Sequence, residues 1–181
     1  QAVPAGHANA QNDIYKSCSK PNIQSGTPTY WLRASEVYFL RAEAALVWEG
    51  FGSADSWYKQ GIDMSFQENG VTDPVDDYMN SNLSPRAYVL SHYQYGQTLS
   101  APCETTVKFE GTTEQKLEKI MIQKWIALFP NGQEAWTEWR RTGYPKLNVI
   151  KTLKGAVQGA TLEGGIRRMI YPTSFSQTNE G

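Results

Sequence analysis

Apolar residues recur at helical spacing in two neighbouring segments of this chain, and a short glycine-containing turn separates the segments. In the first segment, from Ser35, one stripe consists of Val37, Leu40, Ala44 and Trp48, and its flank consists of Phe39, Ala42 and Leu46. This spacing predicts a helix that ends at Gly50 and Gly52. Ser53 is a good N-cap for a second helix, which runs to Asn69-Gly70. The two segments predict a helical hairpin within residues 30–70.

The hairpin also fits the spacing of a tetratricopeptide unit, which places aromatic and small residues at fixed positions in both helices. Those positions hold Tyr38, Ala42, Ala54, Tyr58 and Gly61. Small residues let the two helices cross closely, and the aromatic rings fill the space between them. One unit cannot cover its own apolar faces, and about three are needed for a stable stack. We therefore expect neighbouring units upstream of Gln1 or on another chain.

Residues 70–112 alternate turns with short regular segments. Ser84 and Pro85 predict the start of a short helix, and Val107 to Phe109 predict a brief strand. A stretch this long with little regular structure is usually functional or mobile, and loops commonly carry recognition. The tyrosines of this stretch are therefore the best ligand-binding candidates, and we select Tyr78, Tyr93 and Tyr95.

A third helix begins at Thr113 and shows two apolar stripes, which predicts burial on more than one side. The stripes are Leu117, Ile120, Met121, Trp125 and Leu128, and Ile122, Ile126 and Phe129. Pro130-Asn131-Gly132 ends it, and a shorter helix follows over residues 133–141. The remainder to Gly181 is rich in glycine and loops. The sequence thus predicts an all-α fold with an extended lead-in (1–29), a tetratricopeptide-like hairpin (30–70) and a loop-rich C-terminal subdomain (71–181).

Charge and composition exclude several classes of function. The 17 basic and 18 acidic residues give a net charge of −1, so there is no basic excess to bind the phosphates of nucleic acid. No apolar run approaches the roughly 18 residues of a membrane span. Two histidines and two distant cysteines lack metal-ligand spacing, so we predict no metal and no cofactor. Cys18 and Cys103 are compatible with a disulfide or with two thiols.

Acidic residues raise the question of glycoside hydrolysis, which needs two carboxyl groups. Glu134 and Glu138 lie four residues apart on one predicted helix, and Glu163 follows later. A structural role is much more common for such residues: Glu134 favours the helix dipole, and Glu138 pairs with Arg141 or Arg140. No hydrolase, zinc-protease or nucleotide-binding motif is present. We predict no catalytic residue.

Tryptophans and arginines offer further candidates. Trp125, Trp136 and Trp139 are able to stack on sugar rings, but their helical spacing is more typical of core residues. Arg167-Arg168 suits a carboxylate or phosphate, and equally suits helix C-terminal carbonyls or a nearby Glu.

Three segments of the chain, taken in their order, form a recognisable pattern. The longest runs from Lys119 to Phe129 (KIMIQKWIALF) and continues through Asn131 to Trp136 and Trp139 to Pro145 (WRRTGYP). The other two are Glu36 to Ala44 (EVYFLRAEA) and Arg167 to Pro172 (RRMIYP). Together they resemble the C-terminal half of SusD/RagB-type nutrient-binding lipoproteins, in which the second segment is similar to the helical hairpin and the third to the late motif.

The resemblance implies a helical protein, lipid-anchored on the outer face of the outer membrane of Bacteroidota-type bacteria. Such proteins cover a SusC-like TonB-dependent transporter, capture an oligosaccharide or another nutrient, and pass it inward without chemistry. We expect the N-terminal half, with its signal peptide and acylated cysteine, to lie outside this sequence, so that the membrane is met only through that anchor. The two rival hypotheses are a tetratricopeptide-type interaction scaffold without a small-molecule ligand, and an all-α carbohydrate-active enzyme that uses Glu134 or Glu138.

Overall fold

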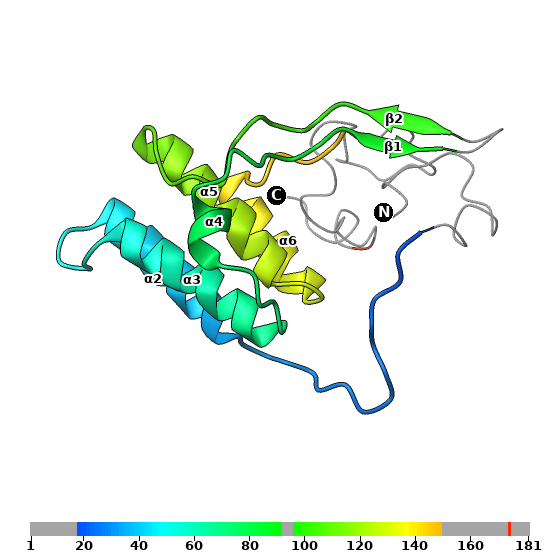
Figure 1. Ribbon diagram of the computed structural model, residues 1–181, viewed down its shortest axis with the longest axis horizontal. Coiled ribbons are helices and arrows are strands. Elements are labelled where there is room, and N and C mark those ends of the chain that lie inside the picture. The colour runs from blue at the N-terminus through cyan, green and yellow to red at the C-terminus, as the bar shows by residue number, and fades with distance from the viewer. Residues whose placement is uncertain (1–17, 92–95, 150–173, 175–181) are drawn as a thin grey trace. The chain divides into compact units, whose positions relative to one another are not determined.

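The computed structural model describes residues 18–91, 96–149 and 174 (Figure 1). The chain divides into two compact units: Ile23–Arg86 with Ala101–Leu147, and Gln1–Asn22 with Ala87–Ser100 and Asn148–Gly181. The first unit, here called the helical unit, contains every helix discussed below. The predicted α-helical fold class is confirmed, with one two-stranded sheet as the β structure among the described residues. The division into residues 1–29, 30–70 and 71–181 stays a prediction.

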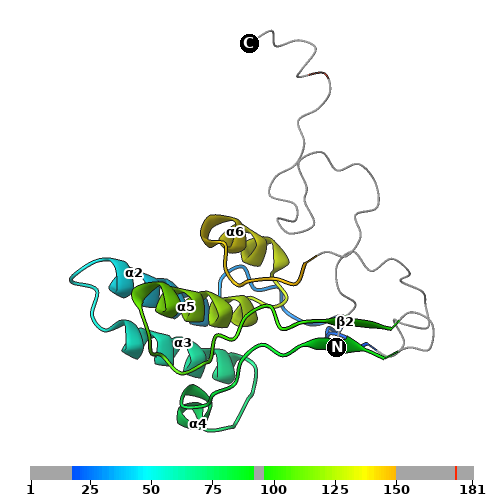
Figure 2. The same ribbon diagram turned by 90° about the horizontal axis from the view of Figure 1, so that it is seen from above.

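Helices α2 (Ala34–Val47) and α3 (Ala54–Glu68) form the predicted hairpin and run side by side in both views (Figures 1 and 2). The Ser53 side chain caps α3 by accepting a hydrogen bond from the backbone N–H of Ser56. Glu68 joins the end of α3 to the start of α2, because its carboxylate accepts hydrogen bonds from the backbone N–H and the hydroxyl of Ser35 at 3.2 and 2.6 Å.

Close packing between α2 and α3 depends on the small residues predicted at the crossing. Ala42 and Gly61 are buried. A Cβ atom at Gly61 would lie only 2.7 Å from the ring of Phe39, well inside van der Waals contact. The ring of Phe39 meets that of Tyr58 edge to face, with centroids 6.3 Å apart. Three of the five tetratricopeptide positions, Ala42, Tyr58 and Gly61, are therefore buried in the hairpin, while the ring that meets Gly61 belongs to Phe39, which lies outside that pattern.

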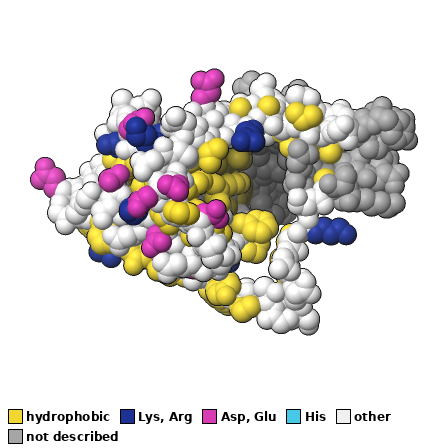
Figure 3. Space-filling view, viewed as in Figure 1, with side chains coloured by type: hydrophobic (Ala, Val, Ile, Leu, Met, Phe, Trp, Pro, Cys, Tyr) yellow, Lys and Arg dark blue, Asp and Glu magenta, His cyan; other side chains and the backbone are white. Residues whose placement is uncertain are grey.

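The face of α2 that enters the core differs from the predicted one. Phe39 and Ala42, assigned to the flank, are buried, whereas Val37 and Leu40 are each 41% exposed and Trp48 lies exposed beyond the helix end. The helix is apolar around most of its circumference, so periodicity alone does not choose the face. The opposing Gly61 does, because it admits the ring of Phe39. Apolar side chains consequently reach the surface over this hairpin (Figure 3).

Helix α5 (Thr113–Ala127) packs against both α2 and α3, and α6 (Gly132–Thr142) follows it (Figure 2). A capping box starts α5, in which Thr112 and Gln115 bond to each other's backbone N–H groups. Gly143 ends α6 with a φ of +76°, a left-handed conformation that suits glycine. The core of the helical unit lies among α2, α3 and α5 and includes Phe39, Tyr58, Ile62, Ile120 and Met121.

Two predictions for residues 70–112 are wrong. No helix begins at Ser84-Pro85, because the chain runs on directly into β1 (Tyr88–Leu90), which pairs antiparallel with β2 (Gln97–Leu99). Val107 to Phe109 form no strand. The backbone of Val107 instead makes two isolated hydrogen bonds: its N–H donates to the carbonyl of Leu83, and its carbonyl accepts from the hydroxyl of Tyr58. Among the described residues of this stretch, the short helix is α4 (Val75–Met79).

No helix among the described residues has the length and apolar character that crossing a membrane requires.

Candidate ligand-binding cavity

A cavity of about 520 Å³ opens on one side of α5 within the helical unit. Three loops complete its wall, formed by residues 83–86, 102–107 and 145–147. Its size falls within the range of small-ligand sites. The apolar part of its lining consists of Leu83, Pro85, Pro102, Val107, Ile122, Trp125, Ile126, Pro145 and Leu147.

Tyr78, a predicted ligand residue, lies in this cavity wall. It belongs to α4, packs on the ring of Phe66 at a centroid distance of 5.4 Å, and is half-buried. Its hydroxyl and the side-chain amide of Gln123 are within hydrogen-bond distance of each other, at 3.1 Å to Nε2. Tyr93 and Tyr95 lie outside the described residues, so their role stays a prediction.

Trp125 also lines the cavity, although its spacing predicted a core residue. It is half-buried, next to Ile122 and Ile126. Ile122 and Ile126 of the second apolar stripe thus line this cavity together with Trp125 of the first, and Ile126 and Phe129 are exposed instead of buried. A second stripe on an already buried helix was the available signal for this surface.

The other two tryptophans have different environments. Trp139 is buried, as expected of a core residue. Trp136 is half-buried, and the guanidinium of Arg140 lies 4.5 Å from the centre of its ring. Neither lines the cavity. Of the three candidates for sugar stacking, only Trp125 lies at this site.

Two hydrogen bonds, one buried and one partly buried, fix the loop that forms one side of the cavity. The hydroxyl of Tyr58 donates to the carbonyl of Val107 at 2.8 Å, and burial raises the pKa of this tyrosine. The ammonium of Lys119 donates to the carbonyl of Thr106 at 2.8 Å. Lys119 is buried, and desolvation lowers its pKa, partly offset by the charges of nearby glutamates. The loop 102–107 is thereby tied to α3 and α5.

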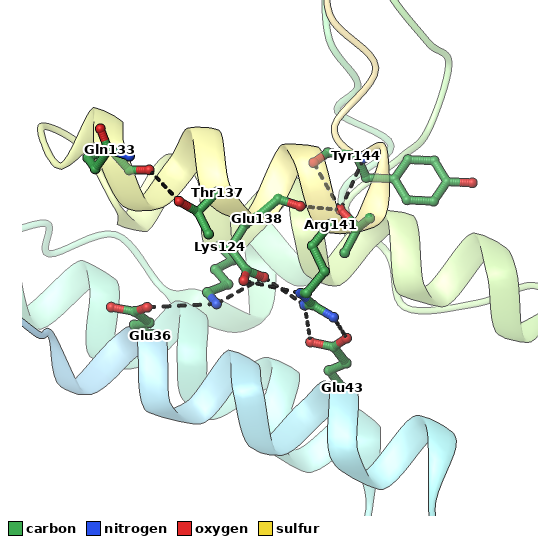
Figure 4. Close-up of polar contacts among 9 residues, drawn as sticks. Glu36, Glu43, Lys124, Gln133, Thr137, Glu138, Arg141 and Tyr144 are labelled. Atoms are coloured by element: carbon green, nitrogen blue, oxygen red, sulfur yellow. Dashed lines mark hydrogen bonds and ion pairs between the residues drawn. The ribbon is translucent and has the colours of Figure 1, made fainter. Parts of the chain in front are cut away.

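An ion network joins α2, α5 and α6; it is buried around Lys124 and exposed at Arg141 (Figure 4). The ammonium of Lys124 lies between two carboxylates, 3.2 Å from Glu138 and 3.7 Å from Glu36. Arg141 binds Glu43 through two parallel hydrogen bonds of 2.7 and 2.8 Å and also reaches Glu138 at 2.7 Å. These contacts connect helices that are distant in sequence.

The pKa values of the two carboxyl groups beside Lys124 are shifted in opposite directions. For Glu138, burial acts to raise the pKa, but hydrogen bonds from Arg141 and the charge of Lys124 outweigh it, so the pKa lies below its usual range. For Glu36, burial dominates over the attraction of Lys124, and neighbouring glutamates add to it, so the pKa is raised.

The structural interpretation of the acidic residues is confirmed. Glu138 pairs with Arg141, and Glu134 lies in the first turn of α6. Glu138 is held ionised by two cations, which does not suit a general acid. Glu163 and Arg167-Arg168 lie outside the described residues. Among the residues that the structure describes, no cluster of His, Cys, Asp and Glu is arranged to hold a metal ion.

These features define a class of protein: a helical scaffold with a tetratricopeptide-type hairpin, and beside it an open cavity with aromatic, apolar and amide groups in its wall. A family model described as "Susd and RagB outer membrane lipoprotein" matches residues 1–181. The chain belongs to this SusD-like family. The resemblance seen in the sequence is thus confirmed.

Solved structures agree with this assignment. A SusD homologue from Bacteroides thetaiotaomicron is 40% identical, with a TM-score of 0.75, and the match covers 86% of this chain and 33% of that one. One from Bacteroides vulgatus is 36% identical with a TM-score of 0.76, covering 87% and 32%. A chitin-binding SusD homologue from Flavobacterium johnsoniae is 41% identical with a TM-score of 0.67, covering 82% and 31%. No curated protein matches the chain.

The chain therefore spans about a third of the length of these structural relatives.

Proposed function

We propose that this chain is part of a cell-surface protein that binds a nutrient, an oligosaccharide in particular, and passes it to a SusC-like TonB-dependent transporter. The observation that carries the proposal is the cavity beside α5, in which Trp125, Tyr78 and Gln123 lie together. An indole face packs well on a pyranose ring, and amide and hydroxyl groups bond its hydroxyls. Membership of an outer membrane lipoprotein family supports the location, and one chitin-binding relative supports the ligand class.

In this proposal the protein acts by binding and release, without changing its ligand. The carboxylate of Glu138 is engaged in structural ion pairs with Lys124 and Arg141. The lipid anchor and the outward orientation are expectations from the family.

Affinity electrophoresis tests the ligand class. The protein, expressed from its complete reading frame, is run through gels that contain a broad panel of polysaccharides. We expect at least one polysaccharide to retard it and to change its tryptophan fluorescence. Binding to none of them contradicts the oligosaccharide proposal. Purification of the protein from its own outer membrane tests delivery separately, since a barrel transporter should accompany it.

A tetratricopeptide-type interaction scaffold is the second candidate, favoured by the close crossing at Ala42 and Gly61 and by the exposed apolar side chains of α2. It predicts a stable complex with a protein partner and no change in tryptophan fluorescence on addition of any sugar. The two candidates are therefore separated by the same titration.

A further inference from the structure

The cavity has an unusual balance of charge in its wall. Its described lining contains three cationic side chains, Arg86, Lys119 and Lys146, and no Asp or Glu. The chain as a whole is close to neutral, with 17 basic and 18 acidic residues. On the surface of a nearly neutral chain, basic side chains are on average accompanied by a similar number of carboxylates. The excess of positive charge is therefore a local property of the cavity.

Two of these cations have no carboxylate partner among the residues that the structure describes. Arg86 has no ion pair with any described residue, and the ammonium of Lys146 lies over the ring of Tyr144, 4.6 Å from its centre. Elsewhere in the helical unit, Lys59 pairs with Asp76 and Lys108 pairs with Glu110. Arg86 and Lys146 are also exposed, so a ligand in the cavity can reach them.

Lys119 contributes less than Arg86 and Lys146 to the positive potential in the cavity. It is buried, its ammonium is bonded to Thr106, and the charges of Glu110 and Glu118 act on it. It also borders a second cavity of about 420 Å³ whose lining includes Glu104 and Glu110. The positive potential available to a ligand therefore comes mainly from Arg86 and Lys146.

We propose that the cavity is selective for an acidic oligosaccharide, one whose sugar ring packs on Trp125 while an anionic substituent lies between Arg86 and Lys146. This inference rests on the proposed function and specifies its ligand class. The apolar lining suits the flat face of a sugar ring. A carboxylate or a sulfate supplies the charge, since guanidinium and ammonium groups bind either anion. The cations of the wall attract the anionic substituent, and the described lining contains no Asp or Glu that would repel it.

Isothermal titration of the protein from its complete reading frame tests this selectivity. The ligands are acidic oligosaccharides of two kinds, uronates and sulfated sugars, each paired with its carboxyl-reduced or desulfated counterpart. We expect at least one acidic member to bind about tenfold or more tightly than its neutral counterpart at low salt, and this preference to shrink at high salt. The uronate and sulfate arms identify which anion is recognised.

The variant Arg86→Gln/Lys146→Gln should reduce the preference for the acidic member over its neutral counterpart to about threefold or less. Lys59→Gln/Lys108→Gln removes the same charge from outside the cavity and should leave the preference intact. Circular dichroism confirms that both variants are folded.

Equal affinity for every acidic and neutral pair overturns the inference, as does a preference that survives in Arg86→Gln/Lys146→Gln. In either case, binding of any oligosaccharide leaves the proposed function standing. Binding of no sugar, acidic or neutral, contradicts both. Capture of acidic peptides in place of acidic sugars overturns the inference in favour of a different ligand class.

Discussion

Removing the ammonium of Lys124 should destabilise the protein more than any other change of a single charge among the described residues. Its side chain is 2% exposed and lies 3.2 Å from Glu138 and 3.7 Å from Glu36. With an effective dielectric constant of about 20, two unit charges at 3.2 Å attract by about 5 kcal/mol. Burial of all three groups offsets much of this attraction. Its loss, however, leaves the buried carboxylate of Glu36 without a cation and leaves Glu138 with Arg141 alone, at a cost of about 3–5 kcal/mol.

Lys124→Met keeps an unbranched side chain, one heavy atom shorter than that of lysine, and removes the ammonium group with its charge. With a urea dependence of about 2 kcal/mol per molar, the expected loss lowers the unfolding midpoint by about 2 M. Chemical unfolding near pH 7, followed by tryptophan fluorescence, measures the change. A loss below about 1 kcal/mol would refute the reasoning, because that is the magnitude of an exposed ion pair.

Two controls make the result specific to the buried network. Lys59→Met breaks the exposed pair with Asp76 and should leave the midpoint nearly unchanged. Adding Glu36→Gln to Lys124→Met should restore part of the lost stability, because it removes the buried carboxylate that has lost its cation. A further loss in this double variant would contradict the electrostatic explanation.

Three further predictions concern single sites. Tyr58→Phe leaves the buried carbonyl of Val107 without its donor and should cost about 1–3 kcal/mol in urea unfolding, whereas an unchanged midpoint contradicts the bond. Gly61→Ala should lower stability by up to about 2 kcal/mol, because its Cβ would meet the ring of Phe39, although the same change usually stabilises a helix; a rise in the midpoint refutes the close crossing. Burial raises the pKa of Glu36, so the folded state binds that proton more tightly than the unfolded state and stability falls as the pH rises from about 4.5 through the folded-state pKa. Glu36→Gln should therefore gain stability relative to the natural protein as the pH rises through that window, and a difference that stays constant from pH 4 to pH 8 contradicts it.

The elements of the hairpin could be predicted because their ends carry strong local signals. Ser53 caps α3, and Gly50 and Gly52 adopt left-handed backbone conformations with φ of +86° and +85° in the turn before it. Which face of α2 is buried was harder to predict from the sequence, since that helix is apolar on several sides. It depended on Gly61, a residue in the other helix.

The burial of Lys124 could be predicted from the sequence, but its partners could not. Lys124 lies four residues after Ile120 and four before Leu128, in a stripe that is otherwise buried. A lysine at such a position predicts a buried cation with a carboxylate partner. Its partners, Glu36 and Glu138, lie far away in sequence in other helices, so helical periodicity cannot name them.

The cavity could not be predicted as a site, because its wall is assembled by long-range contacts. The bond from Tyr58 to Val107 and that from Lys119 to Thr106 bring the loop 102–107 to the helices. The prediction of Tyr78 came from its place in a loop-rich stretch, whereas Trp125 was assigned to the core because helical spacing does not distinguish a core stripe from a cavity wall.

The most direct test of the account is the affinity of a bound oligosaccharide for two tryptophan variants, measured by isothermal titration. Trp125→Ala removes the ring in the cavity, and Trp136→Ala removes a half-buried ring outside it. We predict that Trp125→Ala weakens binding by about tenfold or more, as expected for an aromatic hot spot, while Trp136→Ala binds as the natural protein does. Equal affinity of the natural protein and Trp125→Ala would contradict the claim that this cavity holds the ligand.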